Sequence, residues 1–200
     1  MKVAIVDYGA GNLSSLKAAL VAVGAAPFIA RQPAELNVAK RIIVPGVGHF
    51  SATAQLRQSG LEQAIRDAIE RSVPLLGICL GMQWLFQGSE EAPNLPGLAA
   101  FAGGSRRFPA GVKTPHVGWN QLQQTQAPSQ LLQGVPQNCY AYFTHSYRVP
   151  AASQTIGTCD YAGDFSAVVE QGAIFGVQFH PEKSSAVGLR ILENFCSLPC

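Results

Sequence analysis

The 200-residue chain is predicted to fold as an α/β protein, with a doubly wound, mostly parallel sheet that carries helices on both faces and an antiparallel extension. Two observations predict this fold class. In the first part of the chain, short apolar runs alternate with segments of helical periodicity, which is typical of parallel strands joined by crossover helices. After residues 88–104, which are rich in Pro and Gly, strand-like runs follow one another through turns, as antiparallel strands do.

Each element of the parallel part follows from a short pattern. The β-branched run at 2–6 ends in a Gly-rich turn, and the next helix has apolar residues every three or four positions and stops at Gly24. The stripe at 61–69 has the spacing of a crossover helix, and the apolar run at 173–179 is typical of a buried strand. In all, this part is expected to hold strands at 2–6, 28–30, 41–44, 73–78 and 173–179 and helices at 13–23, 61–69 and 186–196.

The extension is built from the remaining strand-like runs. They are expected at 118–122, 139–149, 155–161 and 167–170, where they extend or cover the first sheet. A chain of this length can bury a full hydrophobic core without disulfides or a structural metal, so residues 1–200 are expected to form a single domain.

Composition narrows the function classes. Apolar residues make up 48% of the chain and charged residues 13%, a low charged fraction that indicates surface covered by a partner. The net charge is only +2 and basic residues are spread along the chain, with a tight pair at Arg106-Arg107, so nucleic acid is not an expected partner. The sequence has no signal-peptide pattern and no apolar run of membrane-spanning length, so we expect a cytoplasmic protein with no membrane partner.

Cysteine usage fits a reducing compartment. The chain has no C-x-x-C pair, and Cys196 and Cys200 have no histidine near them to complete a zinc site. Neither a metal site nor a cofactor is therefore predicted. Cys139 and Cys159, like Cys196 and Cys200, are expected to be reduced thiols with a structural or incidental role, which leaves Cys79.

Cys79 stands between a short apolar strand and a segment of helical character that reaches residue 86. Gly77 and Gly81 flank it, as at a nucleophile elbow, where the central residue is strained and its neighbours must lack side chains. The thiol would then stand exposed at a helix N-terminus, where free N–H groups and the helix dipole favour the thiolate. A packed, unreactive cysteine has the same local pattern, so a catalytic role requires a base elsewhere.

The loop at 45–48 is expected beside Cys79, because it follows a parallel strand and the chemistry of such sheets collects at the carboxyl ends of the strands. Gly46, Val47 and Gly48 leave backbone N–H groups free to point at a ligand, which is how an oxyanion is held. An ordinary turn is the alternative interpretation.

His180 and Glu182 supply the base. Pro181 biases His180 toward an extended conformation, in which residues two apart share a face, so the carboxylate can orient the imidazole. A lone histidine is more often structural, but here a strand leads directly into it and a carboxylate follows. Together with Cys79 and the loop at 45–48, these residues fill the three roles of acyl transfer. The thiolate attacks a carbonyl, the histidine protonates the leaving nitrogen, and water then hydrolyses the thioester.

These residues belong to motifs that carry a family resemblance. GICLGMQ at 77–83, together with FHPE at 179–182, resembles the class I, triad-type glutamine amidotransferases. Further motifs together resemble the family of glutaminase subunits of imidazole glycerol phosphate synthase, which act in histidine biosynthesis. They are DYGAGNL at 7–13, PGVG at 45–48, HVGWN at 116–120, YFTHSY at 142–147 and HPEKS at 180–184. The resemblance runs nearly end to end.

The resemblance implies hydrolysis of glutamine to glutamate and ammonia. It implies that Cys79, His180 and Glu182 are the triad, and that the loop at 45–48 and Leu80 surround the oxyanion. No cofactor is implied.

The resemblance also implies glutamine contacts from Gln83, Glu91 and Ser146. Trp84 stands where an aliphatic residue is more usual, which bears on local helix packing and not on the chemistry. Thr144-His145 varies one motif position without removing a catalytic group.

A partner is expected on chemical grounds, because ammonia released into water is protonated and lost as a nucleophile. The resemblance implies a cyclase subunit with a (β/α)8 barrel fold, in a heterodimer, that uses the ammonia to form imidazole glycerol phosphate and AICAR. Asn12, Trp119 and Tyr142 lie on motifs outside the general amidotransferase set and are candidates for the docking face, with ordinary packing as the alternative. In the free subunit, the loop at 45–48 is expected to present a carbonyl instead of an N–H.

Two other functions stay open. One is the glutaminase of a different synthase, such as the one that makes pyridoxal phosphate, whose family shares the triad but not the H-x-G-W-N segment. The other is a degenerate amidotransferase fold that only binds a partner, although all three triad residues are present. The G-x-G at 9–11 matches a dinucleotide-binding fingerprint only weakly, since the third glycine and the ribose-binding acid are missing.

Overall fold

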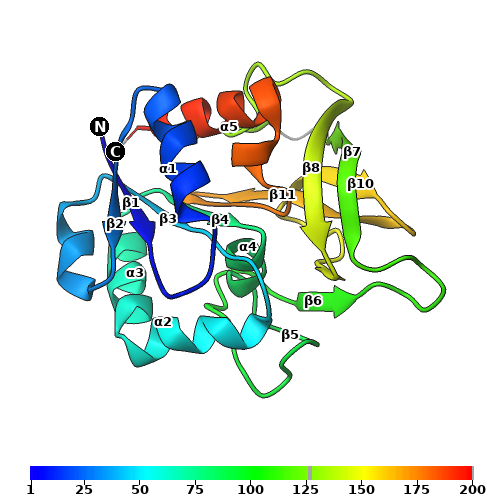
Figure 1. Ribbon diagram of the computed structural model, residues 1–200, viewed down its shortest axis with the longest axis horizontal. Coiled ribbons are helices and arrows are strands. Elements are labelled where there is room, and N and C mark those ends of the chain that lie inside the picture. The colour runs from blue at the N-terminus through cyan, green and yellow to red at the C-terminus, as the bar shows by residue number, and fades with distance from the viewer. Residues whose placement is uncertain (126–127, 200) are drawn as a thin grey trace.

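The computed structural model describes residues 1–125 and 128–199, whose largest element is a nine-stranded sheet (Figure 1). Its strand order is β2-β1-β3-β4-β12-β11-β10-β7-β8. The parallel strands are β1 (Lys2–Val6), β2 (Ala26–Ala30), β3 (Arg41–Val44), β4 (Leu75–Ile78) and β12 (Ile174–Val177). The antiparallel strands are β7 (His116–Gln124), β8 (Cys139–His145), β10 (Thr155–Asp160) and β11 (Asp164–Gln171). The predicted fold class is confirmed, and the antiparallel strands extend the parallel sheet.

Helices cover both faces of the parallel strands (Figure 1). One face carries α1 (Leu13–Ala22) and α5 (Ser185–Ser197), and the other carries α2 (Ala54–Gln58), α3 (Leu61–Glu70) and α4 (Leu80–Trp84). Alternation along β1 supplies both cores, because Val3 and Ile5 pack with α1 and α5 while Ala4 and Val6 pack with α2 and α3. The short helices are η1 (Pro33–Val38), η2 (Phe50–Thr53) and η3 (Pro181–Lys183).

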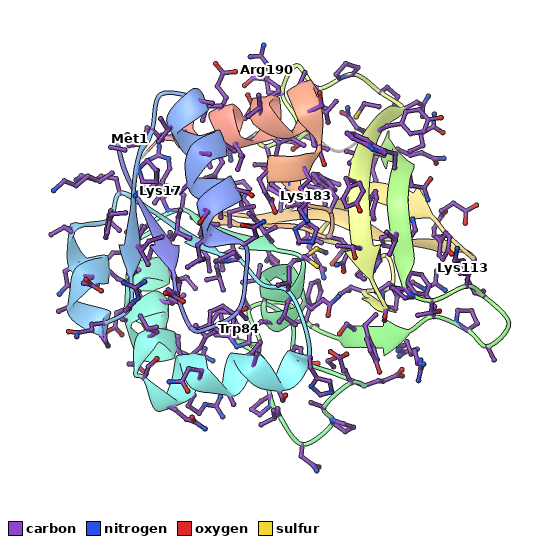
Figure 2. The ribbon with its side chains drawn as sticks, viewed as in Figure 1. Met1, Lys17, Trp84, Lys113, Lys183 and Arg190 are labelled. Carbon is purple, nitrogen blue, oxygen red and sulfur yellow. The ribbon has the colours of Figure 1, made fainter. Side chains whose placement is uncertain are left out.

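Trp84, which stands where an aliphatic residue is more usual, packs inside the protein. Its side chain is fully buried at the end of α4, whereas Arg190 points outward from α5 (Figure 2). The helix ends at Trp84 and not at residue 86: the N–H groups of Leu85 and Phe86 bond to carbonyls three residues back, and the Trp84 carbonyl accepts from the N–H of Leu98.

The prediction of one strand over 139–149 is wrong. β8 ends at His145, and residues Tyr147–Arg148 form a separate strand, β9, that pairs with β6 (Gly104–Arg107) in a three-stranded sheet with β5 (Gly88–Ser89). The local pattern of residues 139–149 could not reveal this change of partner, because β6 is distant in sequence. The break places Ser146 at the rim of the large sheet. Within the described ranges, no helix has the length and apolar character needed to cross a membrane.

Candidate active site

Cys79 lies at a sharp turn between β4 and α4. Its φ of 53° and ψ of −107° are strained values for a residue with a side chain, as expected at a nucleophile elbow. The flanking glycines are required by space. A Cβ at Gly81 would collide with the carbonyl of Val44, and a Cβ at Gly77 would lie 2.6 Å from the carbonyl oxygen of Gly81. The predicted elbow geometry is therefore present.

The structure describes three other thiols. Cys139, Cys159 and Cys196 are unpaired, and burial raises the pKa of each of them, for Cys159 to about 12. They are therefore protonated at neutral pH. Cys200 lies outside the described residues.

His180 and Glu182 form a buried pair at the end of β12. Nδ1 of His180 lies 3.0 Å from Oε1 of Glu182, so this nitrogen carries the proton that the carboxylate accepts. Burial by itself lowers the pKa of His180, but the Cys79 sulfur and then Glu182 outweigh burial and raise the pKa to about 10. Nε2 is buried and has no hydrogen-bond partner of normal geometry among the described residues. Among the described residues, no competing hydrogen-bond partner therefore occupies this nitrogen.

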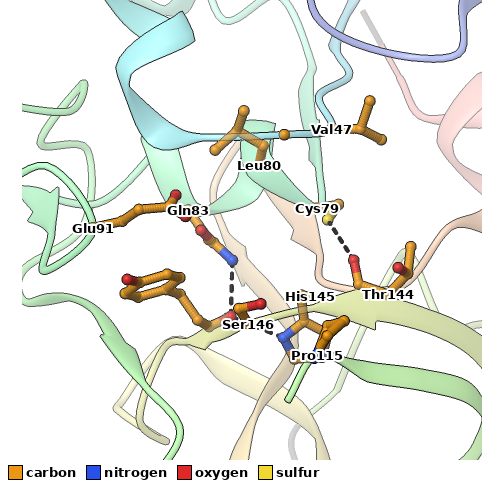
Figure 3. Close-up of a pocket in the computed structure, with 11 residues that line it drawn as sticks. Val47, Cys79, Leu80, Gln83, Glu91, Pro115, Thr144, His145 and Ser146 are labelled. Atoms are coloured by element: carbon orange, nitrogen blue, oxygen red, sulfur yellow. Dashed lines mark hydrogen bonds between the residues drawn. The ribbon is translucent and has the colours of Figure 1, made fainter.

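A cavity of about 320 Å³ opens beside Cys79 (Figure 3). Of the predicted site residues, it is lined by Val47, Gly48, Cys79, Leu80, Gln83, Glu91 and Ser146. Gly46, His180 and Glu182 do not line it. Cys79 is only 5% exposed, so the expectation of an exposed thiol is wrong. Its sulfur lies 3.8 Å from the carbonyl oxygen of Thr144, at the end of β8 (Figure 3).

The loop at 45–48 is held in a defined position. The hydroxyl of Tyr8 donates to the carbonyl of Pro45 at 2.8 Å, and Glu91 accepts from the N–H of Phe50 at 2.7 Å. The carbonyl of Gly46 accepts from the N–H of Leu80 at 3.4 Å. Leu80 thus has no free N–H for an oxyanion in this conformation.

Sequence reasoning missed Gln178. Its side chain is fully buried, its Nε2 donates to Sγ of Cys79 at 3.6 Å, and its Oε1 accepts from Nε2 of Gln83 at 3.1 Å. Gln83 also donates to the carbonyl of Tyr147 at 2.9 Å, which leaves its own oxygen for a ligand. The signal in the sequence is that Gln178 is polar within the apolar run at 173–179.

The three candidate docking residues do not form one tight cluster of contacts. Trp119 is 53% exposed, and its ring meets that of Tyr142 edge-on, with centroids 6.1 Å apart. Tyr142 also accepts through its carbonyl from the N–H of His180 at 2.9 Å. Asn12 caps α1 by accepting from the N–H of Ser15, which gives this side chain a structural role within the chain itself.

Comparisons with known proteins identify the family of this chain. Residues 4–198 match the family model described as glutamine amidotransferase class-I. The imidazole glycerol phosphate synthase subunit HisH of Moorella thermoacetica is 47% identical, over 98% of this chain and 94% of the relative. The HisH subunit of Thermococcus kodakarensis is 44% identical, over 96% of this chain and 98% of the relative.

Solved structures with the same fold include one titled as a crystal structure of glutamine amidotransferase, at a TM-score of 0.76 and 22% identity over 97% of this chain and 98% of that one. Another is PurLQS from Thermotoga maritima, at a TM-score of 0.75 and 20% identity over 98% of this chain and 97% of that one. The chain therefore belongs to the class-I glutamine amidotransferase family, and within it to the HisH subunits of imidazole glycerol phosphate synthase.

Proposed function

We propose that residues 1–200 act as one glutaminase domain, which hydrolyses glutamine to glutamate and ammonia for the synthesis of imidazole glycerol phosphate. The observation that carries this proposal is the strained Cys79 at the wall of a cavity, next to the buried His180–Glu182 pair. The match to HisH subunits supports the assignment to histidine biosynthesis.

In the proposed reaction, the Cys79 thiolate attacks the side-chain amide carbon of glutamine and forms a tetrahedral intermediate. His180 then donates a proton to the amide nitrogen, the C–N bond breaks, and ammonia leaves a thioester behind. Water, deprotonated by the same imidazole, attacks the thioester and releases glutamate. Glu182 keeps the imidazole oriented and stabilises its charged form.

Three cavity residues are proposed to bind the glutamine. Gln83 offers the oxygen that its internal hydrogen bonds leave free. Ser146 and the carboxylate of Glu91 line the same cavity, where they can accept from the substrate ammonium group. Glu91 also accepts from the N–H of Phe50, two residues after the loop at 45–48, so a substrate held by Glu91 would lie close to this loop.

The conformation of the loop at 45–48 supports the proposal that the free subunit is in an inactive state. An oxyanion needs at least one free N–H, and the Leu80 N–H is engaged by the Gly46 carbonyl. We infer that partner docking turns this loop, so that its carbonyl leaves Leu80 and its own N–H groups, with that of Leu80, face the oxyanion.

The partner is proposed to be a cyclase subunit with a (β/α)8 barrel, paired as a heterodimer in the cytoplasm. Asn12, Trp119 and Tyr142 are the proposed docking residues. Two observations support this face: the exposure of Trp119, and the backbone link from Tyr142 to His180, which connects a docked partner to the base.

The experiment that tests the function is to mix the chain with candidate acceptor synthases and follow glutamate formation. We expect turnover with the cyclase of imidazole glycerol phosphate synthase, loss of turnover in Cys79→Ala with partner binding retained, and wild-type turnover in Cys139→Ala. Glutamate formation by Cys79→Ala would overturn the assignment of the nucleophile. Labelling of Cys79 by a glutamine-like alkylating agent separates an active site from a fold that only binds a partner.

A further inference from the structure

The Cys79 sulfur has two polar neighbours, one that stabilises the thiol and one that stabilises the thiolate. Its thiol donates to the carbonyl of Thr144 at 3.8 Å, and it accepts from Nε2 of Gln178 at 3.6 Å (the first contact is drawn in Figure 3). A carbonyl oxygen can only accept a hydrogen bond, so Thr144 stabilises the protonated sulfur. An amide N–H can only donate, so Gln178 stabilises the thiolate.

The orientation of the Gln178 amide is dictated by the carbonyl of Tyr147. Because this carbonyl only accepts, Gln83 must turn its NH₂ group toward it, at 2.9 Å. The second hydrogen of that group then goes to Oε1 of Gln178, at 3.1 Å. With its oxygen engaged, Gln178 has only its own NH₂ group to present to Cys79. The reverse orientation would set two NH₂ groups against each other.

The same carbonyl orders a second set of hydrogen bonds. Nδ1 of His145 donates to Tyr147 at 2.8 Å, so Nε2 of His145 accepts from Nδ1 of His116 at 3.1 Å. Nε2 of His116 in turn accepts from Asn120 at 3.2 Å. Burial lowers the pKa of His116 to about 4 and of His145 to about 3, so both rings are neutral at pH 7 and the donor order holds. The carbonyl of Tyr147 is thus fixed from two sides.

We propose that Gln178 is a positioning residue for the nucleophile, because it donates a hydrogen bond to the Cys79 thiolate. The Tyr147 carbonyl sets the orientation of the Gln178 amide through Gln83. This inference rests on the proposed role of Cys79 as the nucleophile. It adds a side chain that contacts the Cys79 sulfur directly and the cavity-lining Gln83 through a hydrogen bond.

The test is the rate of Cys79 alkylation by iodoacetamide as a function of pH, measured on the full chain by peptide mass spectrometry. Gln178→Met removes the donor at similar volume, and we expect the rate at pH 7 to fall about tenfold and the midpoint of the pH profile to rise. Gln178→Glu keeps the shape of the side chain but replaces the donor by an acceptor, and should lower the rate further. Gln154→Met, at another buried glutamine, is the matched control and should leave Cys79 unchanged.

The thiol of Cys159 has no exposed surface and reports folding in the same samples, because it reacts only if the variant opens. If Gln178→Met does not fold, Gln178→Glu carries the test. An unchanged pH profile of Cys79 in a folded variant would overturn the role of Gln178. Failure of a glutamine-like alkylating agent to label Cys79 in the wild-type chain would instead overturn the proposed nucleophile.

Discussion

The N–H of Leu80 donates to the carbonyl of Gly46 across 3.4 Å, and this contact connects the first turn of α4 with the loop at 45–48. It joins two segments that were both expected to supply free donors to an oxyanion. In the proposed mechanism, this hydrogen bond opens before the N–H of Leu80 donates to the oxyanion.

Gly48→Ala tests this requirement. Gly48 has a φ of +100°, and a Cβ there meets no atom within 4 Å, so the substitution acts only on the backbone. We expect it to destabilise the observed loop conformation by about 1 kcal/mol and to raise glutamine hydrolysis in the absence of the partner. Gly24→Ala, at a left-handed glycine with equal space at the end of α1, is the control and should not raise it. A lower partner-free rate in Gly48→Ala would mean that the active loop needs the same φ.

Removing the charge of Glu182 should separate its two effects on His180, which are the orientation of the imidazole and the stabilisation of its charged form. Glu182→Gln keeps a group that can hydrogen-bond Nδ1 of His180 but no longer stabilises the imidazolium, so kcat with the partner should fall about a hundredfold. KM for glutamine should change little, since Glu182 does not line the cavity. Glu193→Gln, at an exposed site on α5, should leave both constants unchanged. A change in KM alone would place Glu182 in substrate binding.

The buried histidines predict how stability depends on pH. In the folded state the pKa values of His116 and His145 are about 4 and about 3, below the ordinary value of 6.5. Between pH 6.5 and pH 4 the unfolded chain binds more protons than the folded chain does. The free energy of unfolding should therefore fall as the pH falls through this range. His180 acts in the opposite sense, because its pKa is raised, so its contribution is present below 6.5 and is lost as the pH rises toward 10.

Urea unfolding from pH 4.5 to 9 would measure this profile. His116→Phe should lower stability at pH 7 but flatten the acid side, because one titrating ring is removed. His49→Gln, at the exposed histidine, should reproduce the wild-type profile. An acid limb that is equally steep in His116→Phe would contradict the assignment.

Trp119→Ala should weaken partner binding without unfolding the chain. The ring is 53% exposed and loses mainly its edge contact with Tyr142, whereas a central interface tryptophan typically contributes about 2 kcal/mol or more to binding. We expect a dissociation constant at least tenfold higher, measured by calorimetry with the cyclase, and an unchanged melting temperature. Val38→Ala, at a comparably exposed side chain on η1, should bind normally. Normal binding by Trp119→Ala would remove this residue from the docking face.

Local sequence was enough for the parts of the site that depend on local backbone. Gly77 and Gly81 indicate the elbow in the sequence because no larger residue fits at either position. Glu182 reaches His180 because only Pro181 separates them. The role of Gln178 could not be read in the same way. It depends on the pairing of β12 with β4 and on the carbonyl of Tyr147, whose strand leaves the large sheet to pair with β6. Which N–H groups of a glycine-rich loop are engaged is likewise a matter of its three-dimensional conformation.

The place of β12 in the sheet has a consequence for biosynthesis. β12 lies between β4 and β11 and aligns Val177 with Ile78, so the base reaches the nucleophile only through a strand inserted into the middle of the sheet. On the ribosome β12 is the last strand of this sheet to emerge, and until then the edge of β4 that faces away from β3 has no partner strand. A nascent chain that lacks β12 also lacks the proposed base His180, so it cannot carry out the proposed hydrolysis, and it has an exposed strand edge that can pair with another chain.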